Sequence, residues 1–318
     1  MAKAMPKTKT IILYCSNWGA PDAWQAAFRA EDANLEFRVW PEGGPAGEVD
    51  YILAWHHPSG ELRHYPNLKA IFSLGAGVEK LLRDKELPAG VPIVRMVDHA
   101  LTTCMTEYVV LHVLRYHRRM PELEALQRRA EWLELESPPA WERRVGILGL
   151  GVLGGDAAAK LAGLGFDVAG WSNHAKHIPD VKSFTGEDGL AEVLARSEIL
   201  VCLLPLTAAT TGILSARRFA QMPLGAFLIN AARGGHVVES DLLAALASGQ
   251  LGHATLDVVS EEPLPATHPF WRHPRITLTP HNASLTWPPT AVKHIVANIR
   301  RHESGGPMSP LVDLAREY

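Results

Sequence analysis

The segment of residues 145–154, VGILGLGVLG, limits the possible folds of this chain more than any other part of its sequence. Apolar residues lead into Gly149, Gly151 and Gly154, which have the GxGxxG spacing, and the alanine-rich segment behind them has the composition of a helix. This order predicts a strand, a tight turn and a helix that begins near Val152. Gly149 then permits the turn, Gly151 lets the backbone approach a pyrophosphate, and Gly154 lets the helix pack closely on the strand. The segment therefore predicts a dinucleotide-binding βαβ unit.

The composition of the chain narrows the class of partner. Its 318 residues, 47% of them hydrophobic, are enough for two domains of ordinary size. Lysine and arginine together number 31 and acidic residues 34, so the net charge is close to zero. This balance indicates a small-molecule partner and no nucleic acid.

Cysteine usage and apolar run lengths indicate the compartment. Cys15, Cys104 and Cys202 are far apart in the sequence and lack metal-ligand spacing, so we expect free thiols in a reducing compartment and no metal site. The apolar run near the N-terminus is too short for a signal-peptide core, and no run approaches the length of a membrane span. We therefore expect a cytoplasmic protein without a membrane partner.

Short apolar segments recur on both sides of the glycine-rich turn at the spacing of α/β units. Residues 8–96 contain five or six of them, separated by helical or polar segments, which predicts an open parallel sheet. Behind the turn, a helix is expected at 240–250, with Ser240 as the cap of its amino end and Gly249 as the cap of its carboxyl end. Further strands are expected at 166–171, 198–205, 226–232, 253–259 and 275–280. The chain is thus predicted to form two α/β domains, the second of them a doubly wound sheet.

The segment between the two domains has two parts. Residues 102–119 have apolar positions at helical spacing and predict a long helix that links the domains. Residues 120–144 form a charged arm in which leucines and tryptophans are interspersed. Because such apolar side chains need a surface to cover them, we expect a second subunit there and predict a homodimer.

Polar residues at the carboxyl ends of three successive predicted strands are candidates for a reaction site. Arg233 follows one strand, Asp257 and Glu262 follow the next, and His281 follows the last. Ligands of doubly wound sheets bind outside these ends, where an anion-binding arginine, an orienting carboxylate and a proton donor would meet. Each residue alone has an ordinary alternative, namely a structural salt bridge, a solvated charge or a loop histidine. Their combination behind a dinucleotide turn favours the reactive interpretation.

The first domain offers two further candidates. Residues 74–78, LGAGV, follow a predicted strand, and their amides either bind an anion or form an ordinary glycine turn. Trp55, His56, His57 and Pro58 end another strand. Adjacent residues of a strand point to opposite faces, and no acidic or cysteine cluster accompanies the histidines. We therefore favour a pocket-lining or capping role over a metal site.

Several motifs, in their order and spacing, resemble those of the D-2-hydroxyacid dehydrogenases. They are VGILGLGVLG at 145–154, PLTAATTGIL at 205–214, INAARGG at 229–235, LDVVSEEPLP at 256–265 and TPHNAS at 279–284. A second set resembles more narrowly the glyoxylate/hydroxypyruvate reductase A branch: LAWHHP at 53–58, SLGAGVEKLL at 73–82, MTEYVV at 105–110 and VDLAREY at 312–318. The resemblance covers nearly the whole chain. It implies an α/β protein of two doubly wound parallel-sheet domains, with a Rossmann-type nucleotide domain (101–285) inserted in a flavodoxin-like substrate domain (1–100 and 286–318).

The resemblance also implies a reaction, the reduction of small 2-keto acids such as glyoxylate and hydroxypyruvate to D-2-hydroxy acids by hydride transfer from NADPH or NADH. His281 would donate and accept the proton, and Glu262 would hold its imidazole and favour the protonated form. Arg233 would bind the substrate carboxylate and polarise the keto oxygen. The amides of Ala76 and Gly77 would bind the same carboxylate from the other domain, and closure of the cleft would exclude water.

Further contacts follow from the same resemblance. Trp55 and Trp287 would wall the substrate side, and Asp257 would hold the nicotinamide amide. The implied cofactor-binding residues are Gly149, Gly151, Val152, Leu153, Gly154, Ser172, Asn173, His174, Lys176, Pro205, Leu206, Thr211 and Asp257.

The residues behind the second strand of the nucleotide domain indicate which cofactor is preferred. NAD-specific sheets place an acidic residue about 20 residues beyond the glycines, where it accepts from the ribose 2′-hydroxyl and would repel a 2′-phosphate. Here Ser172, Asn173 and His174 end the strand, Lys176 follows, and no acid lies between them and Asp180. These donors suit a phosphate, so we predict NADPH over NADH. The alternative is a solvated loop and an enzyme that uses both cofactors.

Departures from the family pattern concern substrate and cofactor affinity. Trp287 stands six residues after His281, where this branch would have an arginine, and SNHAK at 172–176 is not arginine-rich. The alternative within the superfamily is a phosphoglycerate or D-lactate dehydrogenase, and Trp55 favours a small 2-keto acid over both. The alternative outside enzymes is a nicotinamide-sensing protein of the corepressor kind. Turnover of glyoxylate with NADPH separates the two classes.

Overall fold

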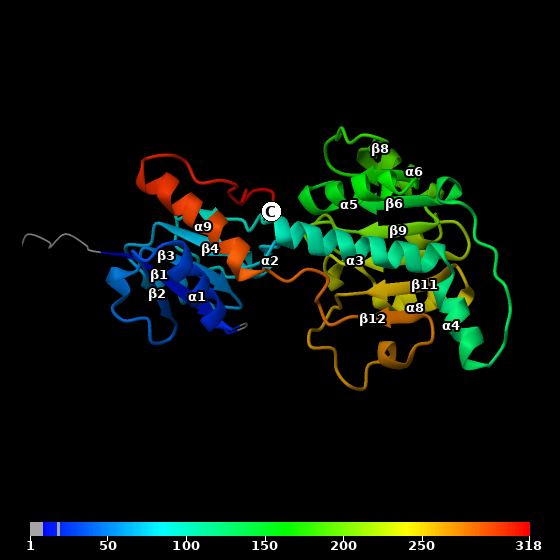
Figure 1. Cartoon of the computed structure of the whole chain (residues 1–318), viewed down its shortest axis with the longest axis horizontal. Helices are drawn as coiled ribbons and strands as arrows, with labels where there is room; N and C mark the ends of the chain where they lie inside the picture. The colour runs from blue at the N-terminus through cyan, green and yellow to red at the C-terminus, as the bar shows by residue number, and fades with distance from the viewer. Residues whose placement is uncertain (1–8, 18–19) are drawn as a thin grey trace, which may run out of the picture. The chain divides into compact units, whose positions relative to one another are not determined.

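The described part of the chain folds into two compact units. The computed structural model describes residues 9–17 and 20–318 (Figure 1). One unit comprises the described residues up to Leu101 together with Leu285–Tyr318, and the other comprises Thr102–Ser284. Each unit is built on its own sheet, and every pairing between two of the described strands is parallel.

The first unit alternates strands and helices. Its strands pair in the order β2-β1-β3-β4-β5, the order of flavodoxin-like sheets. All residues of the central strand β3 are buried, as expected for a parallel strand that is covered on both faces. The described elements are β1 (Thr10–Ser16), α1 (Pro21–Glu31), β2 (Leu35–Val39), β3 (Tyr51–Trp55), β4 (Ala70–Ser73), α2 (Glu79–Leu82), β5 (Ile93–Val94) and α9 (Pro288–Glu303), with 3₁₀ turns at Ala46–Glu48 and Leu62–His64.

Both faces of this first sheet are covered. On one face α1 packs against α9, and α9 buries Val292, Ile295 and Ile299 at helical spacing. On the other face, Leu62 and Leu81 join a buried cluster with strand residues such as Ile52. Because α9 belongs to the last part of the chain, the unit is closed by residues from both sides of the second unit in the sequence.

The long helix α3 (His99–His117) starts in the last residues of the first unit, and from Thr102 on it belongs to the second unit. Helix α4 (Met120–Arg128) follows it. The remaining elements are β6 (Arg144–Leu148), α5 (Val152–Gly163), β7 (Asp167–Trp171), β8 (Val181–Phe184), α6 (Gly186–Arg196), β9 (Ile199–Cys202), α7 (Ala216–Phe219), β10 (Ala226–Asn230), α8 (Glu239–Ser248), β11 (Leu251–Leu256) and β12 (Ile276–Leu278), with 3₁₀ turns at Ala140–Glu142, Gly234–His236 and Pro269–Arg272. The helix predicted to begin near Val152 is confirmed.

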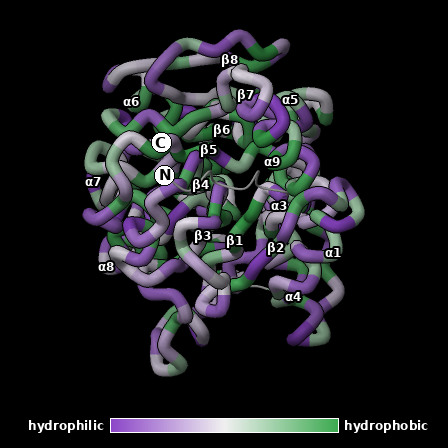
Figure 2. Tube along the Cα trace, turned by 90° about the vertical axis from the view of Figure 1, so that its left-hand side faces the viewer, coloured by the Kyte–Doolittle hydropathy of each residue, from purple (hydrophilic) through white to green (hydrophobic). Residues whose placement is uncertain are grey.

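The second sheet is doubly wound. Its strand order is β12-β11-β10-β9-β6-β7-β8, so the winding direction reverses between β6 and β9, which is where sheets of this kind bind ligands. One buried cluster joins α3 and α5 to one face, and another joins α6, α7 and α8 to the other face. In Figure 2 the trace at the label β6 is drawn in the green of apolar residues, and purple segments lie on outer loops. These features confirm the predicted fold class of two parallel-sheet α/β domains.

Two details of this unit differ from the sequence prediction. Strand β8 was not expected, because its residues VKSF include lysine and serine and none of the four is fully buried. It is an edge strand and needs no continuous apolar run. The prediction that Ser240 caps α8 is wrong: the helix begins one residue earlier, at Glu239, and Val238 occupies the cap. Gly249 ends the helix with a φ of 82°, as predicted.

Helix α3 buries polar side chains against the second sheet. The Tyr116 hydroxyl lies 2.6 Å from Thr255 Oγ1 and 3.1 Å from His253 Nδ1, and His112 Nδ1 lies 3.4 Å from the same threonine oxygen. Burial lowers the pKa of both His112 and His253 to about 4. Both rings are therefore neutral at pH 7 and belong to the core.

The arm between α3 and β6 exposes large apolar side chains. Trp132 is 99% exposed and Trp141 72% exposed, and Leu133 between them is 58% exposed. On α3 itself, Leu111 is also exposed. These side chains have no covering partner surface within the described chain.

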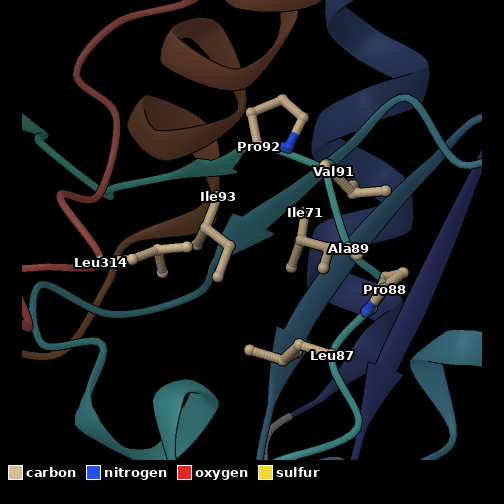
Figure 3. Close-up of a pocket in the computed structure, with 9 residues that line it drawn as sticks. Ile71, Leu87, Pro88, Ala89, Val91, Pro92, Ile93 and Leu314 are labelled. Atoms are coloured by element: carbon tan, nitrogen blue, oxygen red, sulfur yellow. The ribbon is translucent and has the colours of Figure 1, made fainter.

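An apolar pocket lies at the β4–β5 edge of the first unit (Figure 3). Its volume is about 310 Å³, and in the figure Leu314 of the C-terminal segment lies beside Ile93. The lining residues are Ile71, Leu87, Pro88, Ala89, Gly90, Val91, Pro92, Ile93 and Leu314. This lining has no polar side chain and so differs from the residues predicted to bind the substrate carboxylate.

The state of the cysteines and the length of the helices can be compared with the predictions of free thiols and of no membrane span. Cys15, Cys104 and Cys202 are free thiols, and Cys15 and Cys202 are buried while Cys104 is partly exposed. Over the residues that the structure describes, the helices are too short or too polar to cross a membrane.

Candidate active site

Each glycine of the turn behind β6 has a different environment. Gly149 has a φ of 102°, and a Cβ there would lie 2.7 Å from the carbonyl oxygen of Leu203. A Cβ on Gly154 would lie 1.8 Å from the carbonyl oxygen of Gly149. Gly151 caps the amino end of α5 in an extended conformation, and a Cβ there would meet no described atom within 4 Å. The packing of the unit therefore requires two of the glycines, and the third leaves open space at the start of α5.

This open space suits the phosphates of a dinucleotide. The first amides of a helix lack intrahelical acceptors, and the positive end of the helix dipole attracts anions. Because Gly151 has no side chain, a pyrophosphate can approach these amides closely. The contact of Gly149 with Leu203 also joins the ends of β6 and β9, so the turn lies where the sheet reverses its winding. The residues present thus fit a dinucleotide cofactor.

The residues predicted to select the cofactor form a turn behind β7. The Ser172 hydroxyl donates to the carbonyl oxygen of His174 at 2.7 Å, and the Lys176 amide donates to Ser183 Oγ at 2.9 Å. Asn173, His174 and Lys176 are exposed. Since a serine has one hydroxyl hydrogen, Ser172 must release His174 before it can donate to a ligand. The donors that remain available are the side chains of Asn173, His174 and Lys176.

The loop behind β9 contains three of the predicted cofactor contacts. Thr210 Oγ1 donates to the carbonyl oxygen of Pro205 at 2.7 Å, and Thr211 Oγ1 donates to that of Thr207 at 2.8 Å. Leu206 packs close to Gly235, because a Cβ on that glycine would lie 3.0 Å from the leucine Cδ2. The loop is therefore fixed by its own hydroxyl groups and by the loop behind β10.

Asp257 follows β11 and is 2% exposed. Its Oδ1 accepts from Thr279 Oγ1 at 2.6 Å and from the Asn282 amide at 3.0 Å, and its Oδ2 accepts from the Ala283 amide at 3.0 Å. The Tyr108 hydroxyl lies 2.7 Å from Thr279 Oγ1 and extends this network to α3. Both carboxylate oxygens of Asp257 thus hold the loop that contains His281.

That loop gives His281 a rare backbone conformation. Its φ is 54°, in the left-handed region, and its amide donates to the carbonyl oxygens of Asp257 at 2.8 Å and Thr279 at 3.0 Å. Strain of this kind persists only where the surrounding structure fixes it, and it is concentrated at functional sites. The network of Asp257 supplies the fixation and directs the imidazole toward the β11 loop.

Glu262 on the β11 loop receives this imidazole. Its Oε2 lies 2.8 Å from His281 Nδ1, and its Oε1 accepts from the Val259 amide at 3.3 Å. The two side chains are 28% and 27% exposed. Because a carboxylate only accepts hydrogen bonds, Nδ1 bears a hydrogen and Nε2 is the ring nitrogen left for a substrate.

Arg233 lies on the neighbouring loop, behind β10. Its Nη1 donates to the carbonyl oxygen of Ala232 at 2.6 Å, and its own carbonyl oxygen accepts from Asn230 Nδ2 at 3.0 Å. A Cβ on the next residue, Gly234, would lie 1.9 Å from the carbonyl carbon of Val259. The Arg233 loop therefore packs directly on the loop of Glu262. Since Glu262 contacts His281, the structure brings together the loops of all three predicted catalytic residues.

The first unit places its candidates at the ends of β3 and β4. Trp55 is 6% exposed, and a Cβ on Gly75 would lie 2.9 Å from the edge of its indole. The Ser73 hydroxyl lies 2.8 Å from the carbonyl oxygen of Gly75, and because a trans peptide directs its carbonyl and N–H oppositely, the Ala76 N–H points away from Ser73. Among the described residues, no acceptor is found for the amides of Ala76 and Gly77. These amides are free to bind an anion.

His57, close to Trp55 in the sequence, has a structural partner in Asp84. His57 Nε2 lies 3.1 Å from Asp84 Oδ2, and that carboxylate also accepts from the Gly60 amide at 3.0 Å. Burial of Asp84 acts to raise its pKa, but hydrogen bonds from the amides of Glu86 and Gly60 and from His57 and Ser59 outweigh it and hold the pKa below the usual value. His57 thus caps a loop, in line with the predicted capping role. Within the described ranges, no group of three His, Cys, Asp or Glu residues is arranged to hold a metal.

Trp287 differs from Trp55 in its surroundings. It is the cap residue of α9 and is 60% exposed, whereas Trp55 is buried against Gly75. Its neighbour Thr286 donates to the carbonyl oxygen of Leu74 at 2.6 Å and so ties this segment to the loop of Ala76. The first unit thus places Trp55 and the segment of Trp287 at the same loop.

Sequence reasoning missed several residues that shape this site. Tyr108 and Thr279 support Asp257, and Gly234 lets two reactive loops touch. The first glycine of ARGG, Gly234, was a visible signal for close packing. Tyr108 gave no signal, because its partner Thr279 is 171 residues away in the sequence.

Comparisons with known proteins agree with this geometry. Residues 110–283 match the family model described as D-isomer specific 2-hydroxyacid dehydrogenase, NAD binding domain. Over 300 residues the chain is 44% identical to a protein of Yersinia enterocolitica named glyoxylate/hydroxypyruvate reductase A. The aligned region covers 93% of this chain and 96% of the relative.

Solved structures are similar over nearly the whole chain. One is a D-isomer specific 2-hydroxyacid dehydrogenase from Xanthobacter autotrophicus Py2 in complex with NADPH and MES, with a TM-score of 0.94, 42% identity, and coverage of 98% of this chain and 100% of that one. Another is an NADPH-dependent glyoxylate/hydroxypyruvate reductase from Sinorhizobium meliloti in complex with NADP and sulfate, with a TM-score of 0.92, 38% identity and the same coverage. The motif resemblance is confirmed, and the chain belongs to the D-isomer specific 2-hydroxyacid dehydrogenase family of oxidoreductases, in its glyoxylate/hydroxypyruvate reductase A branch.

Proposed function

We propose that this chain reduces glyoxylate and hydroxypyruvate to the corresponding 2-hydroxy acids, D-configured where the product is chiral, with NADPH as the reductant. The observation that carries the proposal is the 2.8 Å contact between His281 Nδ1 and Glu262 Oε2, on loops that pack against the loop of Arg233. The names of the relatives and the NADPH and NADP in the two similar structures support the substrates and the cofactor. Residues 102–284 form the cofactor-binding domain in this proposal, and the first unit supplies substrate contacts.

The chemical step needs one hydride and one proton. The reduced nicotinamide supplies the hydride that reduces the keto carbon. Protonated His281 donates its Nε2 proton to the keto oxygen, so that the C=O becomes CH–OH, while Glu262 keeps the ring oriented and stabilises the imidazolium. The His–Glu pair thus acts as the proton relay of the reaction.

Anion binding holds the substrate for this step. Arg233 binds the substrate carboxylate and stabilises the negative charge that develops on the keto oxygen. The amides of Ala76 and Gly77 bind the carboxylate, and Trp55 and Trp287 limit the size of the substrate. Asp257 acts by fixing the His281 loop, in addition to the contact with the nicotinamide amide that the family pattern implies.

A panel of substrates with both reduced cofactors tests the function. We expect glyoxylate and hydroxypyruvate to be reduced with a higher kcat/KM for NADPH than for NADH, because Asn173 and Lys176 can donate to a 2′-phosphate and no carboxylate repels it. The Ser172→Asp variant should shift the preference toward NADH. Ser172→Ala, which removes the same hydroxyl without adding charge, is the matched control. Failure to reduce either keto acid would refute the function, and equal kcat/KM values for the two cofactors would refute the preference alone.

Replacement of Glu262 by glutamine should move the pH limit of the reduction. Glutamine keeps an oxygen for Nδ1 but removes the negative charge, so the imidazolium of His281 is less stable and loses its proton at lower pH. Because the reduction needs the protonated ring, kcat/KM should decline at a lower pH than in the wild type on the alkaline side. The profile is measured as kcat/KM for glyoxylate across pH. Glu261→Gln changes the adjacent carboxylate, which is exposed, and should leave the profile in place. A profile that does not move in Glu262→Gln contradicts the pairing.

We further propose that the enzyme is a homodimer in the cytoplasm, where its free thiols stay reduced. Trp132, Leu133 and Trp141 are exposed apolar side chains of the arm, and a symmetric dimer would bury the same side chains on both subunits. The wild type should therefore show twice the monomer mass in light scattering at micromolar concentration. Trp132→Asp combined with Trp141→Asp should yield monomers. Trp271→Asp, at a tryptophan that is 53% exposed outside the arm, should not. A wild-type monomer would refute the dimer.

A further inference from the structure

His236 is a fully buried histidine close to the reactive arginine. It lies in the 3₁₀ turn Gly234–His236 behind β10 and is 0% exposed. Its Nδ1 lies 3.0 Å from the carbonyl oxygen of Arg233, and its Nε2 lies 3.2 Å from the carbonyl oxygen of Pro205. The ring therefore spans two peptide carbonyls that are 28 residues apart in the sequence, and the reaction described above does not use it.

The two carbonyls belong to two different loops of the site. Arg233 lies on the β10 loop, and its carbonyl oxygen also accepts from Asn230 Nδ2 at 3.0 Å. Pro205 begins the β9 loop, and its carbonyl oxygen also accepts from Thr210 Oγ1 at 2.7 Å. Next to the ring, the Leu214 amide donates to the carbonyl oxygen of His236 itself at 2.9 Å. His236 is thus at the centre of the contact between the two loops.

We propose that His236 is a positioning residue that couples the substrate-binding Arg233 to the cofactor-binding loop of Pro205. This inference rests on the proposed function, which assigns the arginine to the keto acid carboxylate and the β9 loop to the cofactor. Nδ1 contacts the Arg233 loop and Nε2 the Pro205 loop. Because both partners are carbonyl oxygens, the ring donates to both loops in its imidazolium form, in which both nitrogens carry a hydrogen. A side chain that keeps only one donor should therefore loosen only one of the two ligands.

Two conservative variants separate the two contacts. In His236→Asn the side-chain amide nitrogen replaces Nδ1 and can still donate to Arg233, and in His236→Gln it replaces Nε2 and can still donate to Pro205. We expect His236→Asn to raise the NADPH Kd about fivefold with the glyoxylate KM within twofold of the wild type, since one ordinary hydrogen bond is lost. His236→Gln should show the reverse. The Kd is measured by fluorescence titration of NADPH in the absence of keto acid, and the KM by steady-state kinetics.

A third variant and a matched control complete the experiment. His236→Leu should raise both constants and lower kcat. His253→Leu removes another buried histidine of the same unit, 7% exposed and bonded to Tyr116, and should lower the melting temperature while both constants stay at wild-type values. If His236→Leu does not fold, the asparagine and glutamine variants alone test whether His236 couples the two loops.

The outcomes distinguish this inference from the proposed function. If the asparagine and glutamine variants change only the melting temperature, as the His253→Leu control does, His236 is merely a core residue and the inference is wrong. The inference is also wrong if both variants change Kd and KM to the same extent. If the wild type does not reduce glyoxylate, the proposed function fails. In that case the NADPH Kd alone still tests the Nε2 contact. A Kd that is raised in His236→Asn and unchanged in His236→Gln supports the contact with the Pro205 loop, and any other pattern contradicts it.

Discussion

Replacement of His281 by alanine is expected to lower kcat for glyoxylate reduction by roughly 10²–10⁴-fold, the usual contribution of a positioned proton donor. The keto oxygen then has to take its proton from water, while the hydride donor and the carboxylate contacts stay in place. The NADPH Kd should therefore remain at its wild-type value, and the loss should appear in kcat and kcat/KM together. Steady-state kinetics and a fluorescence titration of NADPH measure both quantities.

A second histidine–glutamate pair in the same unit provides the control. His268 Nε2 lies 3.3 Å from Glu239 Oε2, and these side chains are exposed to a similar extent, 22% and 26%. His268→Ala should lower kcat by less than a factor of three if only the His281 pair takes part in the reaction. Near wild-type turnover of His281→Ala would remove that residue from the mechanism.

Replacement of Gly234 by alanine should lower kcat/KM by about 10²-fold, the effect of moving reactive groups by about 1 Å. An alanine Cβ would lie 1.9 Å from the carbonyl carbon of Val259 and 2.4 Å from the Ser260 amide nitrogen. Both neighbours are backbone atoms, so the two loops must separate. Arg233 then moves relative to Glu262 and His281, although none of the three is changed.

Gly163 offers the matched substitution. It lies in α5, and a Cβ there would meet no described atom within 4 Å. Gly163 is the last residue of this helix, so Gly163→Ala adds one methyl group in open space and should keep wild-type kinetics and a melting temperature close to that of the wild type. If Gly234→Ala reduces glyoxylate at the wild-type rate, the contact between the loops does not position the arginine.

The architecture could be predicted from the sequence wherever burial left a clear pattern. Strands β6, β9 and β10 are continuous apolar runs because helices cover both of their faces, and the glycines mark the turn between β6 and α5. The pattern was missing for β8, which has an exposed edge and contains Lys182 and Ser183. Helix α8 showed the limit for boundaries, since Glu239 begins the helix without a side-chain cap, while the sequence suggested the hydroxyl of Ser240.

The site was predictable in its residue types but not in its contacts. The motifs identified Arg233, Glu262 and His281, but the 2.8 Å His–Glu contact depends on the path of the β11 loop. Asp257 was expected to bind the nicotinamide amide, whereas its hydrogen bonds in the structure hold the loop of His281. His236 gave no signal, because its partners are backbone carbonyls that any residue possesses.

The glycines of the β6 turn fall into two classes, and the distinction bears on how related sequences diverge. Gly149 and Gly154 are required by the chain itself, because Gly149 has a positive φ and a Cβ on Gly154 would lie 1.8 Å from a backbone oxygen, so a descendant that keeps this turn is expected to keep them. A Cβ on Gly151 would meet no described atom within 4 Å, so the packing of the chain does not require this glycine, whereas a close phosphate would. A homologue that lost its cofactor during evolution would be free to mutate the middle glycine first. We therefore expect the middle glycine of the motif to be kept in proteins of this fold that bind a nucleotide, and the two outer glycines to be kept wherever the fold itself is kept.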